Sequence, residues 1–227
     1  MAPDSLVAKT QSAYVDFQWK GDITALRKAM ASIPPDEDPD GSVTSVKWDG
    51  AMLERDFNTA KQVLDSTPLT EISYLTGGLT PKSFLAGCTA LALHDATSAK
   101  DNFEAARKAF ESAAAEAPNN ADRHAGLGLC LAFMGRKEDA IREGKRAVEL
   151  KPESKDALDG AIMNCCLALI YARVGENALA IPLIERLLHT PGAVDSVNYS
   201  ITINDLKFRW EWDGLRHDPA FQKLISK

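Results

Sequence analysis

The sequence predicts an all-α protein built from antiparallel helix pairs stacked side by side. A helix–turn–helix pattern spans residues 121–152, and the same spacing recurs over residues 161–191. Composition agrees, because 45% hydrophobic and 26% charged residues are ordinary for a soluble protein. A chain of 227 residues is longer than most compact domains, but an array of helix pairs grows by adding repeats, so one continuous array accommodates it.

The clearest pair begins with a helix that is expected from Ala121 to the turn at residues 134–137. Leu127, Gly128 and Leu131 occupy positions i, i+1 and i+4, so they share one broad face of this helix. A glycine inside a helix costs about 1 kcal/mol relative to alanine. Gly128 therefore predicts a close approach of the second helix, which is expected from about residue 138 until Pro152 stops it.

The second pair, residues 161–191, repeats these spacings through Leu167, Tyr171, Gly175 and Ala180. It departs from the first at Pro182, which falls inside the expected second helix. Because proline lacks an N–H and clashes with the preceding turn, it should kink that helix or delay its start.

Weaker copies lie towards the N-terminus. Residues 102–118 read as a second helix whose partner is residues 81–94, with a longer loop at 95–101 between them. Residues 48–68 have a helix start at Asp56 and Phe57, and residues 14–34 have a turn at Gly21 and Asp22. The sequence therefore predicts about five helix pairs.

The domain organisation follows from these copies. We expect one array over residues 1–205 and a capping segment over residues 206–227. A proline-rich acidic loop at residues 33–44 interrupts the array, since its prolines, Gly41 and four acidic residues preclude a helix.

The spacing of the clearest pair resembles the tetratricopeptide repeat (TPR), on the residues His124, Leu127, Gly128, Leu131, Gly135, Ala140, Ala147 and Pro152. The tail, residues 212–224, resembles the closing segment of TPR regions in large bacterial signalling proteins that carry a serine/threonine kinase, adenylate cyclase or transcriptional module. The resemblance implies a right-handed superhelix, a TPR-like α-solenoid, that binds other proteins on its concave surface.

Several other functions are not expected. The net charge of −6 argues against nucleic acid as a main partner, and no segment has the roughly twenty apolar residues of a membrane span or the form of an export signal, so we expect a cytoplasmic protein. The four cysteines lack metal-binding spacing and suit buried positions. No nucleotide-binding or catalytic motif is present, so neither an enzyme nor a cofactor is expected.

The predicted binding surface is the face of the first helices that points away from their partners. This surface is chiefly apolar with one cation at its edge, and its candidate residues are Leu129, Phe133, Ile162, Cys165, Leu169 and Arg173. Some TPR domains hold the carboxylate end of chaperone peptides with Lys and Asn on such positions, which are apolar here. An apolar groove would suit a protein or peptide with hydrophobic anchors. Alternatively, these residues pack against neighbouring repeats or the tail.

Two alternatives to a binding scaffold remain. The array could regulate a kinase, cyclase or transcription module of a longer chain in cis. It could also be a self-association element, with Trp210, Trp212 and Phe221 docking into a neighbouring chain. Aromatic residues at the end of a solenoid more often seal its last repeat, so a monomer is expected.

Overall fold

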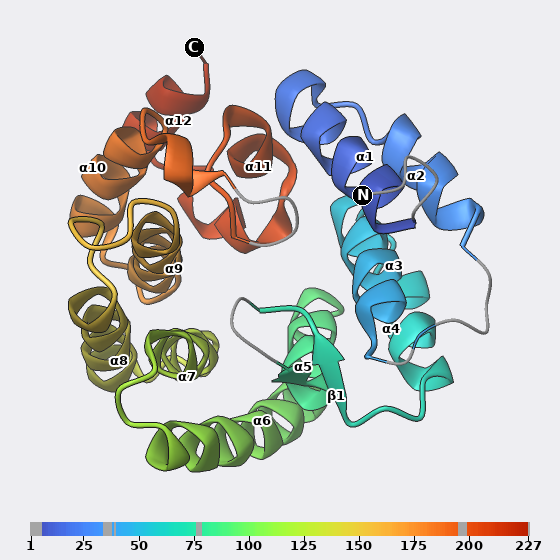
Figure 1. Ribbon diagram of the computed structural model, residues 1–227, viewed down its shortest axis with the longest axis horizontal. Helices are drawn as coiled ribbons and strands as arrows, with labels where there is room; N and C mark the ends of the chain where they lie inside the picture. The colour runs from blue at the N-terminus through green and yellow to red at the C-terminus, as the bar shows by residue number, and fades with distance from the viewer. Residues whose placement is uncertain (1–5, 34–37, 39, 76–78, 195–198, 227) are drawn as a thin grey trace.

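The computed structural model describes residues 6–33, 38, 40–75, 79–194 and 199–226, and it is an all-α helical repeat fold (Figure 1). The paired helices are α1 (Leu6–Lys20), α2 (Thr24–Ala31), α3 (Ser42–Leu53), α4 (Phe57–Ser66), α5 (Lys82–Ala92), α6 (Ala96–Glu116), α7 (Ala121–Phe133), α8 (Lys137–Leu150), α9 (Asp159–Arg173) and α10 (Asn177–Leu187). The chain ends with η1 (Pro191–Ala193), α11 (Ile203–Phe208), η2 (Trp210–Leu215) and α12 (Pro219–Ile225).

The helix pairs follow one another around a ring (Figure 1). Each odd-numbered helix from α1 to α9 packs against the helix that follows it, and α7 also packs against α9. In the later pairs, α7 and α9 face the centre of the ring while α8 and α10 lie outside (Figure 1). The last elements return to the first, because α11 packs against α1. The array is thus closed on itself, whereas the sequence suggested only a capped end.

Turn residues and helix caps explain the pair boundaries. Gly135 and Gly175 end α7 and α9 with φ of +76° and +78°, a conformation that glycine adopts without strain. The Asp56 carboxylate accepts a hydrogen bond from the Thr59 N–H and caps α4, as the sequence predicted. Gly128 also has its predicted role, since an added Cβ would lie 3.0 Å from the Gly144 N of α8.

Three local predictions were wrong or incomplete. Residues 95–101 are not a loop, because the Asp95 carboxylate accepts from the Ser98 N–H and starts α6 at Ala96. Pro182 does not delay α10, which begins at Asn177 and contains the proline. The third is the predicted loop at 33–44, which ends early because α3 starts at Ser42.

The start of α3 depends on Asp38, whose carboxylate accepts from the Val43 N–H at 2.8 Å and the Thr44 N–H at 3.0 Å. Residues 34–37 and 39 of the predicted loop lie outside the described residues.

A short antiparallel hairpin was not expected. Its strands β1 (Glu71–Ser73) and β2 (Leu79–Pro81) pair Ile72 with Thr80. Both of these residues are fully buried, and the backbone N–H of Ser73 donates to the Asp40 carbonyl at 2.9 Å. The hairpin therefore ties the segment before α5 to the segment before α3.

The core consists of two clusters of buried side chains. The larger runs from α3 to α12. The smaller belongs to the first pair and its contact with α3, and consists of Ala13, Tyr14, Phe17, Leu26, Ala29, Val46 and Leu53. The first pair is consequently attached to the molecule through α3 and through the returning C-terminal elements.

Candidate functional site

We define the inner face as the side of α7 and α9 that faces the ring centre (Figure 1), and the sequence predicted the groove residues for this side. Leu129, Cys165 and Leu169 are 0% exposed, Ile162 and Phe133 are also buried, and Arg173 is half-buried. Among the residues that the structure describes, these apolar side chains therefore pack within the molecule and do not line an open groove. Their packing was the alternative that the sequence left open.

The C-terminal segment, residues 199–226, covers this face. The ring of Trp210 lies 5.6 Å from the ring of Phe133, measured between centroids. At η1, just before this segment, the thiol of Cys165 contacts the Ala193 carbonyl at 3.7 Å. Trp210, Trp212 and Phe221 are all buried within this chain, so they are not available for docking into a neighbouring molecule in this conformation.

The C-terminal segment also joins the two ends of the array. Asn204 donates to the Gln18 carbonyl at 2.9 Å, and the Phe208 ring lies 6.1 Å from the Phe17 ring. The Arg55 guanidinium pairs with Asp213, with Nη2 2.8 Å from Oδ1. We call these contacts between the C-terminal segment and α1–α4 the seam. No feature of the sequence indicated them, because each links residues that are more than 150 positions apart.

A buried charged network lies behind the seam. Arg209 Nη1 is 2.8 Å from Asp49 Oδ1, and Arg209 Nε is 2.9 Å from Asp205 Oδ1. Tyr14 donates to Asp49 at 2.9 Å. Although burial disfavours its charge, the two carboxylates hold the pKa of Arg209 well above its usual value. Burial and the neighbouring Asp49 raise the pKa of Tyr14. This network fixes the junction of α11 and η2 on α3 through buried ion pairs.

Three polar atoms beside this network have no hydrogen-bond partner among the residues that the structure describes. They are Arg173 Nε, Trp210 Nε1 and Glu211 Oε2. The Arg173 guanidinium lies over the Phe133 ring at 4.6 Å and the Trp210 ring at 5.8 Å. Burial lowers the pKa of Arg173 and raises the pKa of Glu211 to about 7. Each unsatisfied buried atom costs about 1–3 kcal/mol, so the contact between the inner face and the C-terminal segment is incomplete.

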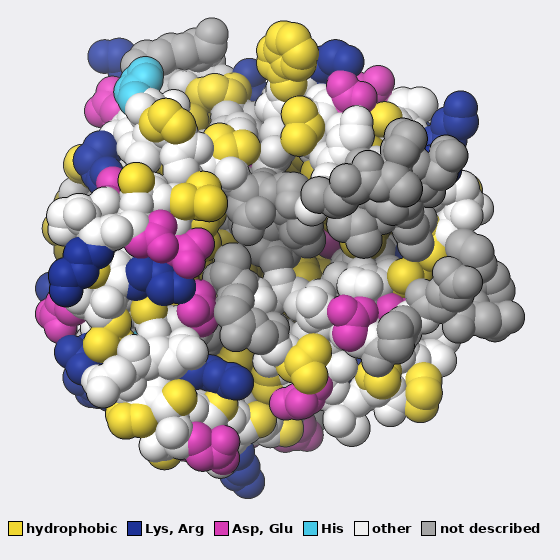
Figure 2. Space-filling model, viewed as in Figure 1, with side chains coloured by type: hydrophobic (Ala, Val, Ile, Leu, Met, Phe, Trp, Pro, Cys, Tyr) yellow, Lys and Arg dark blue, Asp and Glu magenta, His cyan; other side chains and the backbone are white. Residues whose placement is uncertain are grey.

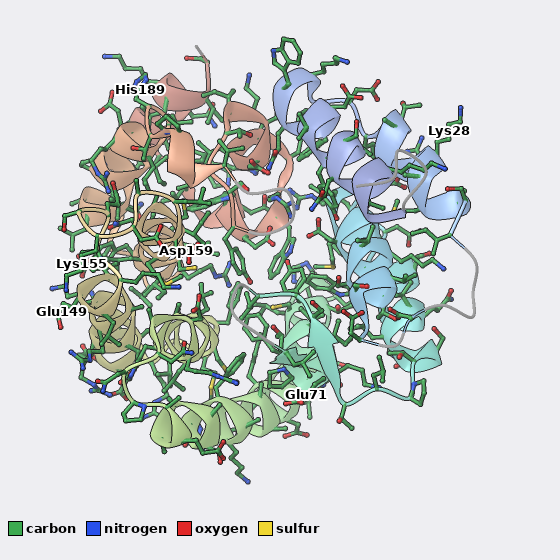
Figure 3. The ribbon with its side chains drawn as sticks, viewed as in Figure 1. Lys28, Glu71, Glu149, Lys155, Asp159 and His189 are labelled. Carbon is green, nitrogen blue, oxygen red and sulfur yellow. The ribbon has the colours of Figure 1, made fainter. Side chains whose placement is uncertain are left out.

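The outer face carries charges of both signs. Glu149, Lys155 and Lys28 lie on the rim and point away from the centre (Figure 3). Arg136 and Arg142 both pair with Asp139, and Lys137 pairs with Glu176. On the face shown in Figure 2, basic and acidic side chains are likewise interspersed. These three basic side chains at and near the start of α8 are thus paired with carboxylates on a solvated surface.

The described part of the chain can be searched for metal-binding clusters, membrane-spanning helices and reactive thiols. There, no group of three or more His, Cys, Asp or Glu side chains could hold a metal ion. No described helix is both long enough and apolar enough to cross a membrane. All four cysteines are buried free thiols, and burial raises the pKa of Cys130 to about 12.

Comparison with known proteins finds a family similarity for one part of the chain. Residues 98–161 match the family model of the tetratricopeptide repeat, a family that generally mediates protein–protein interaction. The match runs from α6 through α7 and α8 into α9. No curated protein and no solved structure matches the chain. The similarity of the tail to bacterial signalling proteins stays a prediction. The central part of the chain is tetratricopeptide-like both in its sequence and in the arrangement of its helices.

Proposed function

We propose that the chain is a non-enzymatic scaffold that binds a protein or peptide partner on the inner face of its helix array. The tetratricopeptide match over residues 98–161 supports a role in protein–protein interaction. The single observation that carries the choice of surface is the seating of the C-terminal segment on the inner face, with the Trp210 ring against Phe133. This intramolecular contact supports a partner that places an apolar side chain on the same surface.

Binding on this surface requires the C-terminal segment to move. Phe133 and Arg173 contact Trp210 directly, whereas Leu129, Cys165 and Leu169 are fully buried. A partner would therefore meet Phe133 and Arg173 first and place an apolar side chain where Trp210 now lies. A partner that buries an apolar area similar to that of the C-terminal segment would make this exchange far less costly than opening an empty groove.

The buried polar atoms without hydrogen-bond partners favour the replacement of the C-terminal segment by a partner. Arg173 Nε and Glu211 Oε2 are unpaired while the segment is seated. Release of the segment returns both groups to water or to a partner that can pair with them. The seated segment is thus a weaker ligand of the inner face than its buried area alone suggests.

A reversible covalent lock tests this proposal. The double variant Arg55→Cys, Asp213→Cys places two thiols across an exposed ion pair of the seam, and a cleavable bis-maleimide can join them. The four native cysteines are buried and should not react. We expect the unlocked variant to capture a protein from source-cell lysate, the locked form to lose it, and cleavage of the linker to restore capture.

The unreacted double variant controls for loss of the Arg55–Asp213 ion pair. Equal capture by locked and unlocked protein would place the partner on another surface. Absence of a specific protein from all three samples would contradict a protein-binding function.

A further inference from the structure

A cavity of about 350 Å³ lies between three consecutive helices, α4, α5 and α6. Apolar side chains form much of its lining, and they are Leu64, Ala86, Ala90 and Leu93. Leu64 and Ala90 are buried whereas Ala86 and Leu93 are half-buried, so the cavity reaches from the core to the surface. Its volume lies within the roughly 300–1,000 Å³ that is typical of sites for small ligands.

The cavity exists because α5 carries two alanines where the next first helices carry large side chains. The three helices are aligned by the residue of positive φ that follows each of their C-caps, which is His94, Gly135 or Gly175. Ala86 and Ala90 precede His94 by eight and four residues. The residues at the same places before the other two turns are Leu127 and Leu131 on α7, and Leu167 and Tyr171 on α9. All four are buried, so both later pairs place side-chain volume where the third pair has a cavity.

The buried polar group of the lining is satisfied within the protein. The Thr89 hydroxyl is 2% exposed, donates to the Leu85 carbonyl at 2.9 Å and accepts from Trp48 Nε1 at 2.8 Å. Thr89 therefore needs no hydrogen bond from a ligand, and the inner end of the cavity favours an apolar group.

The charged groups of the lining leave one cation available. Lys61 pairs with Asp65, and both carboxylate oxygens of Asp95 accept hydrogen bonds at the start of α6. The Lys82 ammonium donates to the Thr67 carbonyl at 2.9 Å, and it pairs with no carboxylate among the residues that the structure describes. Because an ammonium group has three N–H donors, two remain for a ligand.

The ligand that complements this lining has an apolar body and one anionic end. A purely apolar compound would leave Lys82 without an anionic partner. A cation would meet Lys61 and Lys82, while the two acidic residues of the lining are already engaged. A small and fully polar anion would leave the apolar surface of the cavity in contact with water.

We propose that the cavity between α4, α5 and α6 binds a small amphiphilic carboxylate, whose alkyl chain lies on Ala86 and Ala90 and whose carboxylate pairs with Lys82. These three residues occupy positions i, i+4 and i+8, so they follow one face of α5. Leu93 continues this face, and at 1.5 Å per residue it lies roughly 16 Å from Lys82 along the helix. One charged end followed by a run of apolar surface matches a carboxylate with a straight chain.

An equivalent cavity one pair earlier provides a comparison within the molecule. It has a volume of about 310 Å³ and lies between α2, α3 and α4. Aligned by Arg55, whose φ is +61°, its lining has Lys47 and Glu54 where the third pair has Ala86 and Leu93. These charged side chains do not suit an alkyl chain, so we expect only the cavity of the third pair to bind the amphiphile.

The experiment uses the intact chain with ¹³C-labelled alanine methyl groups and octanoate as the probe. The signals of Ala86 and Ala90 are assigned by their loss in Ala86→Leu and Ala90→Leu. We expect octanoate to move both signals. Calorimetry should show affinity rising about fourfold for each added methylene from butanoate to octanoate. Octylammonium and 1-octanol should bind at least about tenfold more weakly than octanoate.

Two variants test the contacts, and a third is a matched control. Ala86→Leu places in the cavity the side chain that α7 has at this position, and it should weaken octanoate binding at least about tenfold. Lys82→Gln should lower the affinity for octanoate to that for 1-octanol. Ala51→Leu fills the equivalent cavity of the second pair and should bind octanoate as the parent does.

Three outcomes would overturn the proposal. If millimolar octanoate moves neither alanine signal, the cavity holds only water. Equal binding of octanoate and 1-octanol by the parent would exclude the pairing with Lys82. Unchanged binding by Ala86→Leu would place the ligand on another surface. The ligand series uses the unaltered protein, so it decides the question even if a variant fails to fold.

This site is independent of the proposed capture of a protein. No residue that lines the cavity belongs to the inner face or contributes to the contacts that define the seam. Locking the seam should therefore leave octanoate binding unchanged, and failure of either proposal carries no consequence for the other.

Discussion

At the residue scale, the close approach of α7 and α8 depends on a glycine that the sequence identified correctly. A Cβ on Gly128 would lie 2.9 Å from Ile170 Cδ1, 3.0 Å from Gly144 N and 3.2 Å from the Ala140 carbonyl oxygen. Two of these three atoms belong to the backbone of α8 and cannot rotate away. The pair must therefore separate to accept any larger residue.

Gly128→Ala should consequently lower the free energy of unfolding. The overpacking outweighs the better helix propensity of alanine, for a net loss of roughly 1 to 2 kcal/mol. Urea denaturation followed by circular dichroism measures the change. Gly214→Ala is the matched control, because its added Cβ meets nothing within 4 Å, and it should change stability little. Equal stability of both variants would contradict the close packing.

A second residue-scale prediction concerns pH. The carboxyl of Glu211 has its pKa raised from 4.5 to about 7 in the folded chain. The folded protein therefore binds more protons than the unfolded chain between these values, and the stability contribution of this group falls as pH rises through that window. At about 1.4 kcal/mol per pKa unit, the fall amounts to roughly 3 kcal/mol.

Glu211→Gln removes this titration and keeps the shape of the side chain. Denaturation midpoints measured from pH 4.5 to 8 should show the parent losing stability relative to the variant as pH rises. Glu71→Gln, at an exposed position, should run parallel to the parent. A constant difference between parent and Glu211→Gln across this range would show that Glu211 ionises normally.

At the element scale, helix boundaries were predictable where a cap or a glycine turn marked them. Gly135, Gly175 and Asp56 gave correct ends because each acts on its own neighbours in the chain. The start of α6 was missed although Asp95 has the same capping role, because the polar residues that follow it suggested a loop. The hairpin β1–β2 was missed because three-residue strands show no readable alternation.

The capping role of Asp95 can be measured. Asp95→Ala removes the acceptor of the Ser98 N–H and should lower the free energy of unfolding by about 1 kcal/mol. Asp101→Ala, at an exposed position inside α6, is the matched control. Hydrogen exchange should show faster exchange only in the first turn of α6. An unchanged first turn would indicate that packing of α6 against α5, and not the cap, sets the helix start.

At the scale of the whole molecule, the site could not be read from the sequence because it depends on closure of the ring. The sequence predicted that the apolar residues Leu129, Cys165 and Leu169 share an open face of the first helices. All three are buried, and whether such a face is open depends on a segment that returns from the far end of the chain. The periodicity of apolar residues indicates which side chains share one face of a helix. It does not indicate which distant segment of the chain covers that face.

Ring closure changes how stability is distributed. In an open solenoid each repeat contacts only its neighbours, so α1 and α2 would be insensitive to residues near the C-terminus. Here α1 and α2 have a small core of their own and gain contacts from Asn204 and Phe208 across the seam. The first pair should therefore depend on α11 although some 180 residues separate them in the chain.

The double variant Asn204→Ala, Phe208→Ala tests this dependence. Amide hydrogen exchange of α1 and α2 should become roughly five- to thirtyfold faster, which corresponds to a loss of about 1 to 2 kcal/mol of local stability, while α7 and α8 keep their protection. Leu179→Ala removes a similarly exposed apolar side chain from α10 and should leave α1 and α2 unchanged. If exchange in the first pair does not respond to the double variant, the seam contributes nothing to its stability and the array behaves as an open solenoid. If α7 and α8 lose protection as strongly as α1 and α2, the ring unfolds as a single cooperative unit in which the seam is one contact among many.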